Sequence, residues 1–245
     1  FFLMIRRPPR STLFPYTTLF RSPARGGSKR IPHKNIKPFL GRPIIAYSIE
    51  AALGTGLFEE VMVSTDDVEI AEIARQEGAS VPFLRSTENA NDYATLADVL
   101  VEVVNAYKGR GYEFDLICCL LPTAPLISSE DVRSAYDQLV MSTFDSICPV
   151  VAFSYPILRS LSIDEKGNLN MNWPEYRFSR SQDLRPAYHD SGTFYWIKTS
   201  SLLKDKKLLS ENGTAIVLDE FRVQDIDTDT DWALAEMKYK LLHMS

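Results

Sequence analysis

The sequence has 245 residues and a formal net charge of -5, with 45% hydrophobic and 24% charged residues, a composition typical of one folded domain with a sizeable core. Ten of the 27 Lys and Arg residues, but none of the 32 Asp and Glu residues, precede Glu50. An acidic chain with one basic segment argues against nucleic-acid binding, which needs a broad positive face, and favours a protein that binds one small polyphosphate.

The sequence also argues against a membrane or secreted protein. No apolar run approaches the roughly 18 residues of a transmembrane helix, and the N-terminal apolar residues precede the arginines instead of following them as in a secretory signal. The three cysteines, Cys118, Cys119 and Cys148, lie in apolar runs, and neighbouring residues on a strand point to opposite faces. We therefore expect buried free thiols, a reducing compartment, a cytoplasmic location and no membrane partner.

Residues 1–22, FFLMIRRPPRSTLFPYTTLFRS, differ in character from the rest of the chain. They show neither helical nor strand periodicity, contain three prolines, and resemble the translation of a sequencing adapter. We expect a non-native or disordered tail here, the alternative being a natural basic tail, followed by one domain over residues 23–245. Because residues 19–22 read LFRS instead of a β-branched run, we expect the first strand of the domain to be damaged or absent.

From Pro43 onward, helical and strand patterns alternate along the chain. The predicted helices are Pro43–Leu53, Val68–Gln76, Ala94–Tyr107, Ser129–Val140 and Thr230–Leu242, and the predicted strands are Val61–Ser64, Val81–Leu84, Leu116–Leu121, Ser146–Val151, Thr193–Ile197 and Ala215–Leu218. This alternation predicts an α/β fold of the Rossmann-like kind, with an open, mostly parallel sheet and helices on both faces. In such sheets, ligands bind beyond the carboxyl ends of the strands.

Residues 153–185 interrupt this alternation. They are polar, aromatic and punctuated by prolines, with a turn at Lys166-Gly167-Asn168 between short alternating segments. We interpret them as a small inserted β-hairpin or lid.

The segment Ala24–Asn35, ARGGSKRIPHKN, carries the clearest chemical signal. Paired glycines let backbone amides approach an anion, a hydroxyl adds a donor, and several cations fall within one short loop. The loop lacks the GK[ST] of a P-loop and the GxGxxG of a dinucleotide fingerprint. Two interpretations remain: the loop binds a triphosphate in another way, or it is a plain basic turn. The residues concerned are Arg25, Gly26, Gly27, Ser28, Lys29, Arg30 and Lys34.

Two pairs of carboxylates lie at probable segment ends. Asp225 and Asp227 are two residues apart, so in an extended segment both side chains point to one face and can ligate magnesium between phosphate oxygens. The alternative is that Asp227 or Asp229 caps the last helix. Asp66 and Asp67 follow a strand, and we expect Asp67 to be a helix N-cap more than a catalytic group.

The loop also resembles the signature of the acylneuraminate cytidylyltransferase family, in which an ARxGSK run precedes a KN pair, matched here by Lys29, Lys34 and Asn35. The resemblance continues through VSTDD (63–67), PTAPL (122–126), RSQDL (180–184) and QDIDT (224–228). Within the family, YHDSG (188–192), FLRS (83–86) and Leu121 are more similar to enzymes that act on pseudaminic acid than to those that act on sialic acid.

The resemblance implies the roles of particular residues. Arg25 and Lys34 hold the phosphates and, with Asp227, form the catalytic group, while Asp225 and Asp227 bind Mg²⁺. The nucleotide site comprises Ala24, Arg25, Gly26, Gly27, Ser28, Lys29, Lys34 and Asn35, with Thr95 a weaker candidate for a cytosine or ribose contact. The sugar site comprises Arg180, Gln182, Tyr188, His189, Asp190 and Tyr195.

Two points about the sugar site stay open. Arg180 or Arg185 can bind the sugar carboxylate bidentately, and His189 is either a ligand or an ordinary surface histidine. Phe194, Tyr195 and Trp196 alternate on a probable strand, so at least one of them belongs to the core.

The implied reaction transfers CMP from CTP to the anomeric hydroxyl of pseudaminic acid in a homodimer, with the inserted segment contacting the partner subunit. N-acylneuraminic or legionaminic acid is the alternative substrate. An inactive relic or a pure nucleotide-binding module is the alternative of a different class, because the first strand is expected to be damaged.

Overall fold

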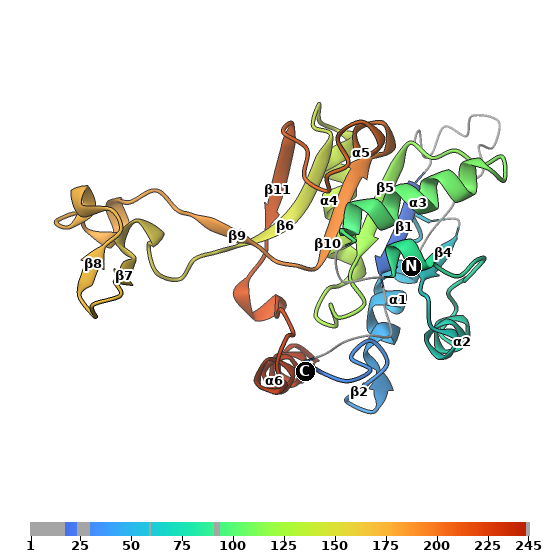
Figure 1. The fold of residues 1–245 in the computed structure, drawn as a ribbon, viewed down its shortest axis with the longest axis horizontal. Coiled ribbons are helices and arrows are strands. Elements are labelled where there is room, and N and C mark those ends of the chain that lie inside the picture. Colours follow the sequence, from blue (N-terminus) through green and yellow to red (C-terminus); the bar gives the residue numbers. More distant parts are fainter. Residues whose placement is uncertain (1–17, 24–29, 59, 91–93, 244–245) are drawn as a thin grey trace.

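The structure, a computed structural model, describes residues 18–23, 30–58, 60–90 and 94–243. Its centre is a seven-stranded sheet in the order β11-β6-β10-β5-β1-β4, with β9 paired to β6 (Figure 1). Strands β4, β1, β5, β6 and β11 run in one direction, and β9 and β10 run in the opposite direction. The strands are β1 (Thr18–Pro23), β4 (Val61–Ser64), β5 (Leu116–Leu120), β6 (Ser146–Ala152), β9 (Tyr188–Asp190), β10 (Phe194–Lys198) and β11 (Gly213–Val217). The predicted open, mostly parallel α/β sheet is confirmed.

The first strand is present, so the expectation that it is absent was wrong. Strand β1 lies inside the sheet, where Phe20 pairs with Val61 of β4 and with Cys118 of β5, both in parallel register. Parallel neighbours on both sides leave a row of backbone donors and acceptors that only a strand satisfies, whatever its sequence. The expected boundary at residue 22 therefore falls within this strand, while residues 1–17 lie outside the described residues.

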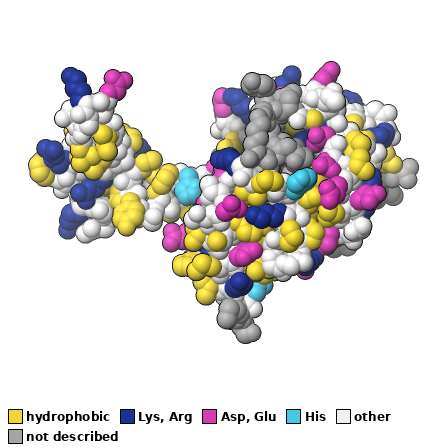
Figure 2. All heavy atoms as spheres, turned by 60° about the horizontal axis from the view of Figure 1, so that its bottom comes forward, with side chains coloured by type: hydrophobic (Ala, Val, Ile, Leu, Met, Phe, Trp, Pro, Cys, Tyr) yellow, Lys and Arg dark blue, Asp and Glu magenta, His cyan; other side chains and the backbone are white. Residues whose placement is uncertain are grey.

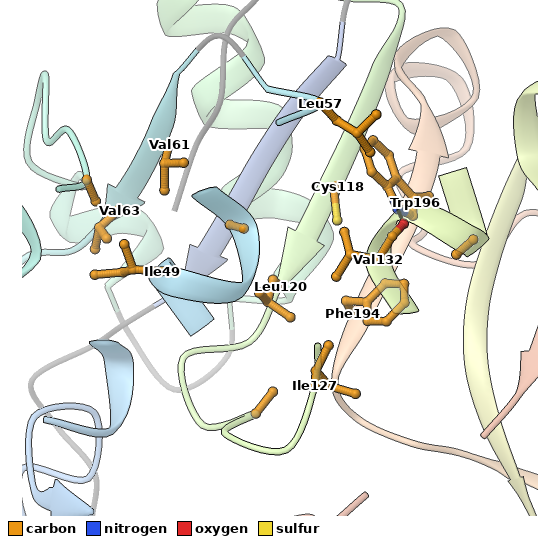
Figure 3. Packing of buried hydrophobic residues seen from close by; sticks show 14 of the residues in the cluster. Ile49, Leu57, Val61, Val63, Cys118, Leu120, Ile127, Val132, Phe194 and Trp196 are labelled. Carbon is orange, nitrogen blue, oxygen red and sulfur yellow. Dashed lines mark hydrogen bonds between the residues drawn. The ribbon is translucent and has the colours of Figure 1, made fainter. Parts of the chain in front are cut away.

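Helices cover both faces of the sheet and enclose two hydrophobic clusters. On one face, α1, α2 and α4 pack over side chains such as Val63, Leu120 and Trp196. Figure 3 shows these three side chains within the cluster. On the other face, α3 and α5 pack over Met62, Ile117 and Tyr195. These helices are α1 (Ile44–Gly54), α2 (Val68–Gln76), α3 (Leu96–Lys108), α4 (Ser129–Val140) and α5 (Thr199–Asp205).

The cysteines follow the alternation expected of strands. Cys118 belongs to the first cluster and its neighbour Cys119 to the second, and all three cysteines are free and buried. Burial raises the pKa of the Cys148 thiol to about 11. The prediction of buried free thiols is confirmed.

A third cluster joins the N-terminal and C-terminal segments below the sheet. It combines Ile31 and Phe39 with Ile226 and Trp232, and the rings of Phe39 and Trp232 meet edge to face with centroids 5.7 Å apart. The elements involved are the hairpin β2 (Pro38–Phe39) and β3 (Arg42–Pro43) and the last helix, α6 (Asp229–His243). This cluster holds the described end of the glycine-rich loop, from Arg30 on, against the segment that carries Asp225 and Asp227.

The described part of the chain lacks one predicted strand and contains elements that were not predicted, among them β2 and β3. Residues 81–84 form no strand, because Pro82 has no N–H to donate, and only Ser80 bridges to Met62. Strand β9 and helix α5 were not predicted. No helix within the described ranges has both the length and the hydrophobicity that crossing a membrane requires.

The insertion at residues 153–185 forms an arm that projects from the end of β6 and returns through β9 (Figure 1). Its tip is a hairpin of β7 (Leu161–Ile163) and β8 (Leu169–Met171), as predicted. Gly167, with φ of 85°, and Asp164, which accepts hydrogen bonds from the backbone amides of Lys166 and Asn168, form the turn. A short 3-10 helix, η2 (Ile157–Arg159), precedes β7. Two others, η3 (Pro174–Tyr176) and η4 (Ser181–Asp183), follow β8. The arm extends away from the sheet and does not close over it.

Candidate active site

The candidate site lies at the edge of the sheet where the parallel strands end. Strand β1 leads into the glycine-rich loop, β6 into the arm, and β11 through η5 (Glu220–Arg222) into the segment with Asp225 and Asp227. The antiparallel strand β10 begins at this same edge. The predicted contacts of Ala24, Arg25, Gly26, Gly27, Ser28 and Lys29 fall outside the described residues.

The end of the loop contacts the carboxylate segment directly. Lys34 Nζ donates to the Ile226 carbonyl oxygen at 2.6 Å and lies 3.4 Å from Asp227 Oδ1. Arg30 Nη2 lies 2.9 Å from Asp227 Oδ2. The structure therefore brings together two groups that are almost 200 residues apart in the sequence and that the proposed chemistry needs side by side.

Buried residues on both segments fix this contact. Ile31 and Ile226 are both buried in the third cluster, and Asn35 is also buried, its carbonyl oxygen accepting from the Ile45 amide at 3.2 Å. Because Ile226 points into the cluster, its neighbours Asp225 and Asp227 point away from it. The alternation of the segment thus presents two carboxylates next to the loop cations.

The two carboxylates suit a divalent cation. Burial, and then the negative charge of Asp227, raise the pKa of the Asp225 carboxyl, so the charges of the pair repel each other in the free protein. Among the described residues no cluster of three or more His, Cys, Asp or Glu side chains forms a complete metal cage. That donor set fits Mg²⁺, which commonly uses one or two carboxylates together with substrate phosphates and water.

The helix caps are made by other residues than Asp225 and Asp227. Thr228 Oγ1 accepts from the Asp231 amide at 3.2 Å, and Asp231 Oδ2 accepts from the amides of Thr228 and Asp227. This reciprocal arrangement satisfies the N-terminus of α6, so the alternative that Asp227 or Asp229 caps the helix is not supported. The Asp225 and Asp227 side chains are not used in this cap, although Asp227 pairs with Arg30 and Lys34.

Two further candidates have structural roles. Asp67 Oδ1 accepts from the amides of Glu69 and Ile70 at 2.8 and 3.3 Å, which makes it the N-cap of α2, as expected. Thr95 caps α3: its hydroxyl accepts from the Asp98 amide at 3.1 Å and lies 2.6 Å from Asp98 Oδ2. The Thr95 hydroxyl is therefore already engaged.

A pocket of about 430 Å³ opens between the start of the arm and the carboxylate segment. His189 and Asp190 from β9 line it together with Asp225, so part of the predicted sugar site adjoins the predicted metal site. Asp190 is held in place by the Tyr195 hydroxyl at 2.7 Å and the Gly192 amide at 2.9 Å. Two of the predicted sugar residues, His189 and Asp190, thus share one cavity with Asp225.

Tyr195 supports this pocket from below. Burial, and then the hydrogen bond to Asp190, raise the pKa of Tyr195, so its hydroxyl stays protonated and donates. Phe194 and Trp196 are fully buried on the opposite face, which agrees with the expectation that part of this run is core. Tyr195 therefore acts by positioning Asp190. Tyr188, the predicted sugar residue next to His189, is instead a surface residue with 45% exposure.

The predicted sugar residues Arg180 and Gln182 lie elsewhere. They belong to the arm, where Arg180 pairs with Asp183 at 2.7 and 3.3 Å, and neither lines the pocket within this chain. His189 is exposed, with Nδ1 2.9 Å from the Asp190 carbonyl oxygen and its ring 5.1 Å from that of Phe153. Sequence reasoning missed Gln224 and Lys238, which do line the pocket. Gln224 stands in the QDIDT motif (224–228) and could have been found, but nothing local distinguishes Lys238 from an ordinary helix-surface lysine.

An open α/β sheet with a cationic loop facing paired carboxylates at its carboxyl edge defines a nucleotidyltransferase. The chain belongs to the cytidylyltransferase family: the family model described as "Cytidylyltransferase" matches residues 23–166. It is 40% identical to a pseudaminic acid cytidylyltransferase of Campylobacter jejuni subsp. jejuni serotype O:2 over 91% of this chain and 96% of that protein.

Other relatives agree in class. The chain is 35% identical to the CMP-N,N'-diacetyllegionaminic acid synthase of Legionella pneumophila, over 89% of this chain and 94% of that protein. Among solved structures, it is similar to a CMP:2-keto-3-deoxy-manno-octonic acid synthetase complexed with CTP, with a TM-score of 0.65 at 18% identity over 93% of this chain and 99% of that one. A likeness at this identity supports the fold.

Proposed function

We propose that this chain transfers CMP from CTP to the anomeric hydroxyl of pseudaminic acid, giving CMP-pseudaminic acid and pyrophosphate for the glycosylation of surface glycans or flagellin. The observation that carries the proposal is the contact of Lys34 and Arg30 with Asp227, beside a pocket lined by Asp190 and Asp225. The similarity to pseudaminic acid cytidylyltransferases over almost the whole chain supports the choice of sugar.

In this reaction the anomeric oxygen attacks the α-phosphorus of CTP, and the bond from that phosphorus to the bridging oxygen of pyrophosphate breaks. Lys34, with Arg25 from the preceding part of the loop, binds the phosphates and stabilises the charge that develops on the leaving pyrophosphate. Asp225 and Asp227 would hold Mg²⁺, which when bound neutralises phosphate charge. Asp190 and His189 would orient the sugar hydroxyls in the pocket.

Turnover with purified sugars tests this proposal. The protein, CTP and Mg²⁺ are incubated separately with pseudaminic, legionaminic and N-acetylneuraminic acid, and pyrophosphate release is measured. We expect the highest kcat/KM with pseudaminic acid, and loss of turnover by at least about a hundredfold in Asp227→Ala, since charge stabilisation in such sites is typically worth that much. Full turnover of Asp227→Ala would refute the metal assignment, and a preference for another sugar would transfer the assignment to that acid.

A nucleotide-binding module without activity is the alternative of a different class. It was suggested by the unusual sequence before the loop, but β1 pairs along its length with β4 and β5. Titration of CTP beside the turnover assay distinguishes the two, because binding without turnover would support the module.

We also propose that the enzyme is a cytoplasmic homodimer whose arm contacts the partner subunit. Figure 2 shows the arm as a separate lobe with hydrophobic side chains over its surface. Phe178 and Tyr155 on the arm are 93% and 85% exposed. Exposed apolar side chains concentrated on one lobe are typical of a protein interface, and buried free thiols suit a reducing compartment.

A further inference from the structure

One cation of the pocket has no role in the site described so far. Lys238 of α6 is the one Lys or Arg among the described residues that line the pocket, alongside His189, Asp190 and Asp225. Its Nζ donates to the carbonyl oxygens of Glu220 at 2.8 Å and Val223 at 2.7 Å. A lysine ammonium has three N–H donors, so two fixed bonds hold Nζ in place and leave one for a ligand.

The charge of Lys238 is not balanced by a protein carboxylate at contact distance. Within the described part of the chain, no Asp or Glu oxygen lies in ion-pair range of its Nζ. Burial is the main influence on Lys238 and lowers its pKa. A partly desolvated ammonium held by two neutral carbonyls attracts an anion more strongly than a solvated surface lysine does.

The chemistry of the substrate class says where such an anion would be. In a nonulosonic acid the carboxylate is attached to the anomeric carbon, the carbon that also carries the attacking hydroxyl. The carboxylate must therefore lie within a few bond lengths of the α-phosphate and the carboxylate pair. Lys238 shares a pocket with Asp225, whereas Arg180 and Arg185 lie on the arm and do not line that pocket.

We propose that Lys238 binds the carboxylate of the acidic sugar and thereby holds the anomeric hydroxyl beside Asp225 and Asp227. The proposal rests on the function proposed above and adds a specificity-determining residue to it. Lys238 selects sugars that carry the acid at the anomeric carbon. Its hydrogen bonds to the carbonyls of Glu220 and Val223 fix its position relative to the segment with Asp225 and Asp227.

Matched substitutions test the role. Lys238→Gln removes the charge but keeps an N–H donor for the carbonyls, Lys238→Arg keeps the charge, and Lys240→Gln is the control at an exposed position of the same helix. We expect Lys238→Gln to raise the KM for the sugar about tenfold or more, as the loss of a hydrogen bond between charged groups predicts, with the KM for CTP within about twofold of wild type. Lys238→Arg should recover part of the loss, and Lys240→Gln should change neither constant.

A second substrate separates carboxylate binding from a purely structural role. Wild type should use the free acid much better than its methyl ester, and this preference should fall about tenfold in Lys238→Gln. If the Gln variant does not fold, Lys238→Met, which keeps the aliphatic stem, takes its place. An unchanged sugar KM, an unchanged preference for acid over ester, or equal increases in both KM values with reduced thermal stability would overturn the proposal. Absence of CMP transfer by wild type to any nonulosonic acid would instead refute the proposed function itself.

Discussion

At the scale of single residues, Asp227 has two competing uses. In the free protein, Asp227 forms ion pairs with Arg30 at 2.9 Å and with Lys34 at 3.4 Å. The proposed reaction requires the same carboxylate oxygens for a divalent cation. The triphosphate of CTP offers the loop cations a stronger anion. Nucleotide binding should therefore release Asp227 to the metal, so metal binding and CTP binding are coupled.

Arg30→Gln tests this competition. Its guanidinium is 68% exposed, and exposed ion pairs are worth at most about 1 kcal/mol, so the variant should bind Mn²⁺ without CTP up to about fivefold more tightly than wild type. Electron paramagnetic resonance of free Mn²⁺ measures this affinity. Arg42→Gln, which breaks pairs with Glu50 and Glu77 away from the site, is the control and should leave the Mn²⁺ affinity unchanged. An unchanged or lower affinity in Arg30→Gln would argue against the competition.

How far the sequence predicts individual site residues depends on whether the signal is local. Asp225 and Asp227 were predicted because alternation around Ile226 is visible in three consecutive residues, and the structure places them beside Lys34. The role of Lys238 depends on the carbonyl groups of Glu220 in η5 and of Val223 just after it, which no sequence pattern reports. Tertiary proximity, and not residue type, makes that lysine part of the pocket.

At the scale of elements, substitution of Thr95 distinguishes a helix-capping role of this residue from a contact with the substrate. Its hydroxyl completes a capping box with Asp98 at the start of α3. Thr95→Ala should therefore lower the free energy of unfolding by about 1 kcal/mol, the usual cost of losing an N-cap, and change the KM for CTP by less than about twofold. Urea denaturation and steady-state kinetics measure the two effects.

Thr95→Ser is the matched variant, because serine keeps the hydroxyl and should retain most of the stability. The opposite pattern, a raised KM for CTP in Thr95→Ala without loss of stability, would favour the cytosine or ribose contact that the family resemblance implies.

Elements were predicted well where propensity and tertiary context agree. Strand β4 and helices α2 and α4 have the predicted bounds, since apolar periodicity and caps act together there. Strand β1 was expected to be damaged because residues 19–22 lack a β-branched run, yet two parallel neighbours supply its hydrogen-bond partners. Strand β9 was not predicted because it, too, depends on tertiary context: its three residues pair with the part of β6 that extends past β10.

At the scale of the whole molecule, the arm is the part that packs least against the rest of the chain. The two faces of the sheet are covered by helices, but the arm stands away from the domain with its hydrophobic side chains uncovered (Figure 2). The sequence predicted the hairpin but not its direction, because the direction depends on how β6 and β9 leave the sheet. Arg180, predicted for the sugar site, lies on this arm and does not line the pocket of its own chain; in the proposed dimer it would face the partner subunit.

The proposed dimer can be tested at the same exposed lobe. We expect wild type to sediment as a dimer at micromolar concentration, and Phe178→Glu to weaken the dimer at least about thirtyfold, because loss of a central aromatic contact at an interface costs about 2 kcal/mol or more. Met141→Glu is the matched control, since Met141 is 87% exposed on the domain and Phe178 is 93% exposed on the arm. If the arm also supplies Arg180 to the partner's pocket, turnover by Phe178→Glu should recover as the protein concentration rises. A monomeric wild type with full activity would show instead that each chain works alone, with Lys238 as the cation that its own pocket provides.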